Sequence, residues 1–320
     1  MMTVLKKLRY IILMLLLISL ISFLAIHAAP NSFFGAGELN PNMTEEAIAQ
    51  LKAVYGLDKP LYQQYIDWVV NLSQFNFGIS FVSGAEVSDE ISKRLPITLL
   101  LNILSMVLVF VISIYLGVKA ALAHGSWLDY TIRQLSLVSF AMPSFYLALL
   151  LMLLLSVQLE WLPIAGLHSV EAKEGFAYYS DMAWHLILPI GVMVFVSLGS
   201  MIVYIRSLTL EILKSDYYYF ARSRGLSGSI LLRRYILRNL IPPVVTLLGL
   251  SLPGLIGGSV ILETIFSIEG MGQLFYLSAL SRDYPVIMGI LIITAFLTLI
   301  GNMLADMLLL KLNPYASREN

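Results

Sequence analysis

Six long runs of apolar residues dominate the sequence and restrict the folds that it can adopt. Hydrophobic residues make up 58% of the 320-residue chain and charged residues only 12%, whereas about a quarter of the residues of soluble domains are charged. A helix needs about 20 apolar residues to cross the roughly 30 Å hydrocarbon core of a bilayer. The runs of about this length are residues 10–29, 96–118, 135–159, 186–205, 240–262 and 285–305. We therefore expect an all-α integral membrane protein with six transmembrane helices, the third of them kinked at Pro143.

The first apolar run follows a basic start at Lys6, Lys7 and Arg9, which fits either a retained helix or a cleavable signal peptide. Residues 10–29 approach full spanning length and exceed the usual core of a signal peptide. We therefore favour a retained first helix over cleavage.

A polar stretch separates the first two apolar runs and carries its own helical patterns. Residues 47–54 follow a turn with acidic residues and predict one helix, which Gly56 would end. Residues 60–72 predict a second, amphipathic helix. The chain thus divides into an N-terminal segment with the first helix, a loop domain, a transmembrane core and a short polar tail, at residues 1–29, 30–95, 96–310 and 311–320.

The basic residues are unevenly distributed among the segments that join the spans. With the N-terminus in the cytoplasm and the spans alternating, most of the 20 Lys and Arg residues fall on the cytoplasmic side. Cytoplasmic loops of membrane proteins carry such an excess of Lys and Arg. Both termini are therefore expected in the cytoplasm, and the loop domain 30–95 is expected in the periplasm.

The segment 207–239, between the fourth and fifth spans, is longer than a simple connection requires. Residues 208–223 have a helical pattern that Gly225 is expected to end, and Ser227 or Ser229 can cap a second helix. The segment therefore predicts two short helices joined at a glycine elbow on the inner membrane surface. Its basic residues fit both a cytoplasmic protein partner and anionic lipid head groups, so the charge pattern leaves both interpretations open.

The elbow reads Asp216-Tyr217-Tyr218-Tyr219-Phe220-Ala221-Arg222-Ser223-Arg224-Gly225-Leu226-Ser227, with an alanine four residues before a glycine. This stretch resembles the coupling loop of the peptide and nickel branch of bacterial ATP-binding-cassette (ABC) importer permeases, the oligopeptide and dipeptide permease B-like family. Tyr219 and Phe220 replace the glutamate and first alanine of the wider motif. Further similar stretches follow in the family's order at residues 56–61, 77–80, 94–99, 237–242, 257–260, 263–266, 270–272 and 282–286.

The resemblance implies a type I ABC importer permease fold in the bacterial inner membrane. It implies that the chain forms half of a translocation path for di- or oligopeptides or for nickel. The implied partners are a second homologous permease, two ABC ATPase subunits, a periplasmic or lipid-anchored substrate-binding protein and membrane lipid, with no nucleic acid. The residues implied to couple the chain to an ATPase are Asp216, Ala221, Arg222, Gly225, Leu226 and Ser227.

No glycine-rich loop ending in Gly-Lys-Ser/Thr occurs in the sequence. The chain is therefore not expected to be an enzyme or to hold a cofactor, and ATP and Mg²⁺ are expected on a partner ATPase. The chain has no cysteine, and its four histidines lack the spacing of metal ligands. No metal site is expected.

Three polar residues lie near the ends of the last two spans, namely Glu263, Asn302 and Asp306. Asn302 and Asp306 are four residues apart and share one helix face. Ionisable groups in membrane segments are functional candidates, so these residues are candidate pore or gate residues. Capping a helix or reaching water at the membrane surface is the alternative role at such positions.

An ion-driven secondary transporter, or another polytopic membrane protein without an ATPase partner, is the alternative class. Such transporters favour inverted repeats and paired charges at the bilayer midplane, and the sequence shows neither pattern. The resemblance implies that substrate choice lies largely with the binding protein, so this chain alone leaves peptide and nickel open.

Overall fold

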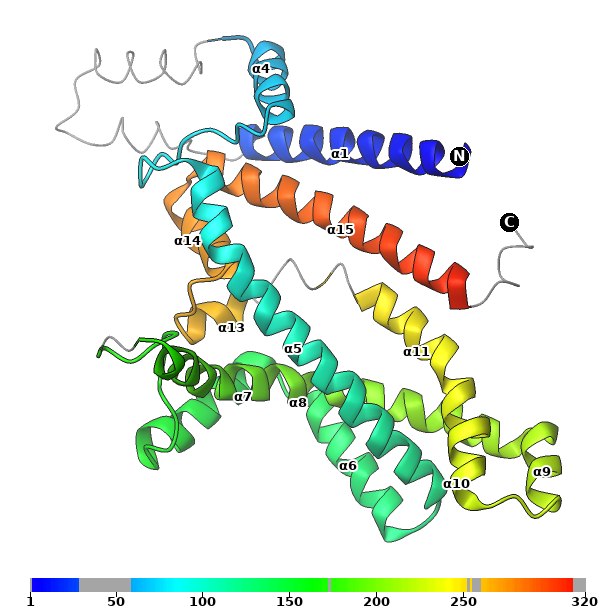
Figure 1. Cartoon of the computed structure of the whole chain (residues 1–320). Helices are drawn as coiled ribbons and strands as arrows, with labels where there is room; N and C mark the ends of the chain where they lie inside the picture. The colour runs from blue at the N-terminus through cyan, green and yellow to red at the C-terminus, as the bar shows by residue number, and fades with distance from the viewer. Residues whose placement is uncertain (1, 29–58, 172–173, 252–253, 255–259, 313–320) are drawn as a thin grey trace.

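The chain is almost entirely helical in the computed structural model, which describes residues 2–28, 59–171, 174–251, 254 and 260–312 (Figure 1). Within these ranges, extended pairing is confined to an isolated antiparallel bridge between Ile79 and Glu86. Helices suit a bilayer because each one satisfies its backbone hydrogen bonds within a single segment. The predicted all-α class is confirmed.

The helical elements follow one another along the chain in a simple order. They are α1 (Met2–Ala28), α4 (Leu61–Ser73), α5 (Val87–Leu122), α6 (Trp127–Ala141), α7 (Ser144–Leu151), the π-helical η1 (Met152–Gln158), α8 (Phe176–Lys214), α9 (Asp216–Ser223), α10 (Gly228–Ile230), the π-helical η2 (Leu231–Leu237), α11 (Arg238–Ser251), α13 (Val260–Ile265), α14 (Met271–Ser281) and α15 (Tyr284–Leu312).

Four helices in the described part of the chain are long and apolar enough to cross a membrane, namely α1, α5, α8 and α15. The bent pair of α6 with α7 and η1 makes a fifth span if it is counted as one. The expected span 240–262 includes residues that are not described. A multi-pass protein is therefore confirmed, and the count of six spans stays a prediction.

The polar stretch before α5 is described only in part. The amphipathic helix predicted at residues 60–72 is confirmed as α4. The helix predicted at residues 47–54 lies outside the described residues. α5 begins at Val87, earlier than the expected start of its span at residue 96, because Pro96 is accommodated inside the helix.

The kink expected at Pro143 is a complete break between two helices. α6 ends at Ala141, Met142 has an extended backbone (φ −84°, ψ 122°), and α7 begins at Ser144. The two arms meet at 101°. Proline offers no N–H to the helix and disfavours helical backbone at the residue before it. The bend therefore falls at the predicted proline, as a break between two helices rather than a kink within one.

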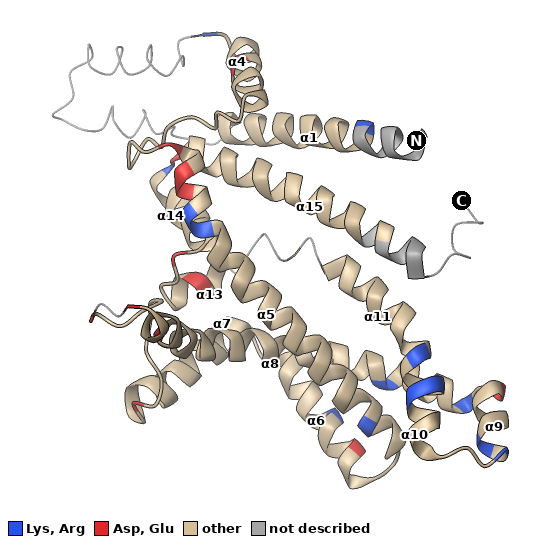
Figure 2. Cartoon of the chain, in the orientation of Figure 1, with Lys and Arg blue, Asp and Glu red and all other residues tan. Residues whose placement is uncertain are grey.

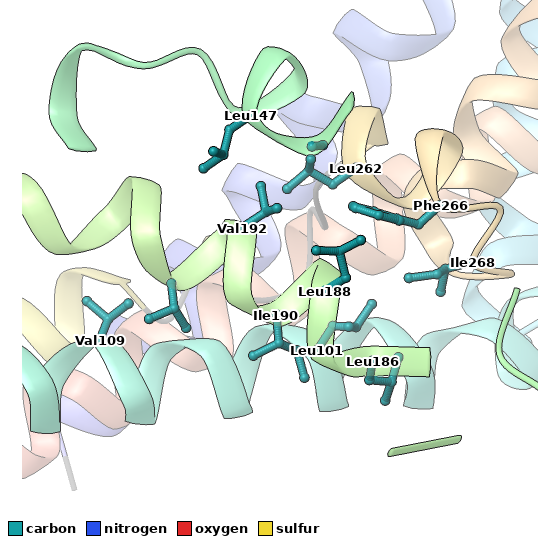
Figure 3. Close-up of a cluster of buried hydrophobic side chains, with 12 residues drawn as sticks. Leu101, Val109, Leu147, Leu186, Leu188, Ile190, Val192, Leu262, Phe266 and Ile268 are labelled. Carbon is teal, nitrogen blue, oxygen red and sulfur yellow. The ribbon is translucent and has the colours of Figure 1, made fainter. Parts of the chain in front are cut away.

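The largest buried cluster joins α5, α7, α8 and α13 (Figure 3). Its labelled members are Leu101, Val109, Leu147, Leu186, Leu188, Ile190, Val192, Leu262, Phe266 and Ile268. Between Leu186 and Val194 of α8, every second residue is buried, which a single helical stripe would not give and which indicates contacts on several sides. α8 is therefore the central helix of the described fold.

Two glycines allow α8 to lie close to its neighbours. A Cβ atom on Gly199 of α8 would lie 2.3 Å from the carbonyl oxygen of Ser136 in α6. A Cβ atom on Gly117 of α5 would lie 2.8 Å from the side chain of Ile205 in α8. Small residues let helix backbones approach in this way within membranes.

Ser139 of α6 bonds directly to the backbone of α8. Its hydroxyl donates to the carbonyl of Phe195 and accepts a 2.9 Å bond from the N–H of Gly199. These two backbone groups are four residues apart and would bond to each other in an uninterrupted α-helix. The hydroxyl therefore attaches α6 to two backbone groups within one turn of α8.

We expect Gly199→Ala to destabilise the protein, by about 1–3 kcal/mol, because the added methyl group overpacks the contact between α6 and α8. Thermal unfolding of the purified protein in detergent measures the effect. Gly191→Ala is the matched control, since no atom lies within 4 Å of a Cβ at that position of the same helix. Equal melting temperatures for the two variants would contradict the packing argument.

Candidate functional site

The elbow, which we define as residues 214–231, begins where α8 stops. Ser215 has an extended backbone (ψ 148°), and its hydroxyl donates a 2.6 Å hydrogen bond to the carbonyl of Ile212. Such local side-chain bonds compete with helical ones. The single helix predicted over 208–223 is therefore wrong, since α8 ends at Lys214 and α9 begins at Asp216.

Gly225 makes the turn after α9, as the sequence predicted. Its φ is 74°, in the left-handed region that favours glycine. No atom lies within 4 Å of the position of a Cβ, so there is room for a larger side chain. Glycine is favoured here because of the backbone conformation. The Gly225 N–H donates a 3.0 Å bond to the carbonyl of Arg222 and closes the turn.

Ser227 precedes the next helical segment, α10, without acting as a side-chain cap. Its carbonyl accepts 3.0 Å bonds from the N–H groups of Ile230 and Leu231. Its hydroxyl lies 3.2 Å from that of Ser229. The two serines that were predicted as alternative caps therefore bond to each other.

One side of α9 is anchored in the protein. Tyr218 and Ala221 are buried, and they are three residues apart on one helix face. They join a cluster that includes Ile205 and Ile212 of α8 and Ile236 of η2. Among the predicted coupling residues, Ala221 thus anchors the elbow, and Leu226 packs against the same cluster from its partly buried position.

The other side of α9 is exposed and aromatic. Tyr219 is 73% exposed and Phe220 63% exposed, and the guanidinium of Arg224 lies 5.8 Å from the Phe220 ring centre. Sequence reasoning treated Tyr219 and Phe220 only as departures from a family motif. Their position beside the anchoring pair could have indicated an outward face, because adjacent residues on a helix point about 100° apart.

The remaining predicted coupling residues also lie on the surface, namely Asp216, Arg222, Gly225 and Ser227. Figure 2 shows Lys and Arg concentrated around α6, α9, α10 and the start of α11, whereas Asp and Glu are concentrated near α13, α14 and the start of α5. The elbow is therefore a basic and aromatic surface at one end of the helical bundle.

A bidentate ion pair holds α8 just before the elbow. Arg206 donates from Nε to Asp129 Oδ1 (2.6 Å) and from Nη2 to Asp129 Oδ2 (2.8 Å). Asp129 is buried, and it also accepts a 3.1 Å bond from the N–H of Gly125. The pair ties the turn between α5 and α6 to α8, and sequence reasoning had no pattern from which to find it.

A second site lies toward the other end of the bundle, around Glu263 of α13. The Glu263 carboxylate is buried and accepts hydrogen bonds from Thr98 Oγ1 (3.1 Å), Gly272 N (2.7 Å) and Gln273 N (3.1 Å). Thr98 Oγ1 in turn accepts a 2.8 Å bond from Met271 N. We call this arrangement the Glu263 junction.

The Glu263 junction joins α5, α13 and the first turn of α14. The carboxylate bonds to N–H groups that have no partner within their own helix. A Cβ on Gly270 would lie 2.4 Å from Glu263 Oε2, and a Cβ on Gly272 would lie 2.8 Å from the Cα of Val260. Thr98, residues 263–266 and residues 270–272 all belong to stretches quoted for the family resemblance, and the fold brings them together.

Two further stretches of the resemblance also meet. Asp283, between α14 and α15, is buried and accepts hydrogen bonds from Ser80 Oγ and from the N–H of Phe81 (3.1 Å). The loop that precedes α5 is thereby attached to the start of α15. Spacing along the sequence could not reveal these contacts, because the partners lie about 200 residues apart.

The three candidate pore or gate residues do not form one group among the described contacts. The partners of Glu263 come from α5 and α14 and not from α15. Asn302 is exposed on α15. The backbone of Asp306 continues the same helix, and its side chain lies outside the described part.

Two of the histidines, His168 and His185, lie near Asp181. His185 Nδ1 lies 2.9 Å from the carbonyl oxygen of Asp181, and the ring of His168 stacks on Tyr178. Within the described ranges, His, Asp and Glu form no group of three or more that could hold a metal ion.

Comparison with known families agrees with the sequence resemblance. Residues 110–318 match the family described as binding-protein-dependent transport system inner membrane component. Residues 1–102 match the N-terminal family of the membrane components of such systems. Together the two matches cover most of the chain.

Several known proteins are similar over nearly their full length. The chain is 39% identical to the oligopeptide transport system permease protein AppB of Bacillus subtilis (strain 168), covering 94% of each protein. It is 35% identical to the di/tripeptide transport system permease protein DppB of Pseudomonas aeruginosa (strain UCBPP-PA14), covering 93% of each. It is 36% identical to the metal-staphylopine import system permease protein CntB of Staphylococcus aureus (strain Mu50 / ATCC 700699), covering 86% of this chain and 84% of that protein.

We expect Glu263→Gln to destabilise the protein by about 1–3 kcal/mol. The carboxylate accepts hydrogen bonds from donors on both of its oxygens, and the amide NH₂ that replaces one oxygen cannot accept them. The melting temperature in detergent measures the loss. Glu269→Gln is the control, since Glu269 is exposed in the same connection between α13 and α14. A Glu263→Gln variant as stable as Glu269→Gln would show that the junction contributes little.

Proposed function

Because this chain belongs to the family of binding-protein-dependent transport system inner membrane components, we propose that its elbow is the surface on which an ATPase subunit acts. The chain is a multi-pass inner-membrane permease subunit of an ABC importer, which confirms the sequence resemblance. The proposal concerns the way in which this permease is driven.

The observation that carries the proposal is the two-sided character of α9. Tyr218 and Ala221 fix one side of the helix to the cluster around α8, while Tyr219 and Phe220 expose two aromatic rings on the other. Exposed apolar surface rimmed by polar residues is typical of a protein–protein interface, and aromatic and Arg residues are enriched there. The exposed rings lie beside Arg222 and Arg224, which supports a protein partner over a purely electrostatic contact with lipid.

Movement of the elbow would reach the bundle through α8. This helix runs from Phe176 to Lys214, and its 39 residues rise about 1.5 Å each, for a length of roughly 58 Å. Its packing against α5 and α6 makes it a stiff connection. Closure of the ATPase subunits on ATP would displace α9 and, with it, α8, and so switch the bundle between two arrangements.

The proposed assembly contains a second homologous permease, two ABC ATPase subunits and a periplasmic or lipid-anchored substrate-binding protein. ATP and Mg²⁺ bind to the ATPase subunits, and this chain binds no cofactor and catalyses no reaction. Both termini and the elbow lie in the cytoplasm in this proposal. The concentration of Lys and Arg at the elbow end of the bundle supports that orientation (Figure 2).

The proposed substrates are di- and oligopeptides, because AppB and DppB are named as peptide permeases and match more than nine-tenths of the chain. The match to CntB makes metal complexes the second candidate. Uptake of labelled peptides or of metal complexes by the complete importer in vesicles distinguishes the two classes.

In this proposal the Glu263 junction has a structural role, because it holds α5, α13 and α14 together. Its buried carboxylate is fully engaged by Thr98 and α14, so it supports the geometry of any gate without lining the path. Asn302 and Asp306 remain the proposed pore or gate residues on α15.

We expect Gly225→Asp to abolish or strongly reduce association with the ATPase, while membrane insertion is retained. The substitution strains the left-handed turn and adds a negative charge to a basic surface. Co-purification of the tagged permease with its ATPase partner measures the loss. Gly84→Asp is the matched control, because Gly84 also has a positive φ (71°) and no atom within 4 Å of a Cβ, but lies in the loop before α5.

A second variant separates the exposed surface from the turn itself. Tyr219→Ser combined with Phe220→Ser removes the exposed rings and leaves Tyr218 and Ala221 in place. The melting temperature should stay close to that of the native protein, and ATPase association should still fall. Native levels of association in this variant and in Gly225→Asp would refute the coupling role.

A further inference from the structure

The amphipathic helix α4 packs across the last part of α1 (Figure 1). The hydroxyls of Tyr65 and Ser19 lie 2.9 Å apart. Gln64 Oε1 lies 3.2 Å from His27 Nε2. The ring of Phe23 lies between these two contacts along α1, and its centre is 5.3 Å from that of Tyr65. The contacts of α4 therefore extend over residues 19–27 of α1.

These contacts fix the depth of α4 relative to α1. The span of α1 covers Arg9–Ala28, so Ser19 lies near its middle and about 14 Å from its end at 1.5 Å per residue. A helix that contacts Ser19, Phe23 and His27 lies level with the half of the span that ends at Ala28. α4 is therefore beside the hydrocarbon and head-group region of one leaflet, and not beyond it.

The same contacts fix which way the sides of α4 point. Gln64 points toward His27 and the end of the span, whereas Tyr65 points toward Ser19 and the bilayer midplane. Successive residues of a helix are rotated by about 100°. The side of α4 next to Tyr65, going around the helix away from α1, therefore points toward the midplane. The side next to Gln64 points away from the midplane.

The face toward the midplane is apolar and unpaired with the described helices. Tyr62, Ile66 and Val70 follow at intervals of four residues and are 69%, 54% and 49% exposed. The adjoining row, rotated by about 100° away from the midplane, is polar, and its residues are Gln63, Asp67 and Asn71. Asp67 there forms a 2.7 Å ion pair with Lys59. The apolar side of α4 thus points toward the hydrocarbon, and its polar side points toward the water at the Ala28 end of α1.

We propose that α4 is an interfacial helix that lies in the leaflet at the Ala28 end of α1 and contacts lipid through Tyr62, Ile66 and Val70. Interfacial helices bury one apolar face to a depth of about 5–10 Å and keep polar residues at the head groups. The aromatic ring of Tyr62 suits this region, where tyrosine is enriched. A binding protein approaching from the periplasm would meet Gln63, Asp67 and Asn71 instead.

The absence of cysteine from the sequence allows single spin labels at chosen positions. The labelled positions are Tyr62→Cys and Ile66→Cys on the apolar face. Asn71→Cys, which lies about 140–180° from them around the same helix, is the matched control on the polar face. The labelled permease is assembled with its partner subunits in vesicles of phosphatidylethanolamine and phosphatidylglycerol. Power saturation compares relaxation by oxygen, which concentrates in lipid, with relaxation by a water-soluble nickel chelate.

We expect the ratio of oxygen to nickel-chelate accessibility to be several-fold higher at residues 62 and 66 than at residue 71. Equal ratios on the two faces would overturn the proposal. Loss of oxygen accessibility at residue 66 when the substrate-binding protein is added would also overturn it, because that protein would then cover the apolar face. The measurement needs neither ATP nor transported substrate, so its outcome is independent of the coupling role of the elbow.

Discussion

The close packing of α8 against α5 and α6 supports the remaining elements of the described fold. Apolar contact alone drives helices together weakly in a bilayer, since lipid chains are as apolar as the side chains. Close approach at Gly117 and Gly199, and polar contacts such as those of Ser139, supply what apolar burial does not. Removal of either would leave the elbow attached to a helix with a less defined position.

The two functional regions differ in the way that they use polar groups. At the Glu263 junction, a buried carboxylate is satisfied entirely by neighbouring groups, and every contact is internal. At the elbow, a buried anchoring pair carries an exposed aromatic and basic surface. The first arrangement holds elements together, and the second leaves an exposed surface at the Lys214 end of α8. The ion pair of Arg206 with Asp129 likewise holds elements together, because it attaches α6 to α8 before the elbow.

Local patterns predicted the helical class, the apolar spans and the turn at Gly225, because each depends on neighbouring residues. They failed at Ser215, where a side-chain bond ends a helix that the predicted pattern would continue. At Pro143 they placed the bend correctly but predicted a kink where the structure has a break between two helices. They could not predict that Thr98 meets Glu263 or that Ser80 meets Asp283, because such contacts depend on how distant helices pack. The exposure of Tyr219 and Phe220 likewise became clear only once the burial of Tyr218 and Ala221 was known.

The Ser139 hydroxyl has a mechanical consequence for α8. An ordinary helix can bend where one of its own hydrogen bonds stretches, and its neighbours need not follow. In α8, the Phe195 carbonyl and the Gly199 N–H are both bonded to a side chain of α6. Bending α8 at this point without moving α6 would break both hydrogen bonds of the Ser139 hydroxyl. The two helices are therefore coupled in motion, and a displacement that begins at the Lys214 end of α8 also reaches the break at Pro143 through α6.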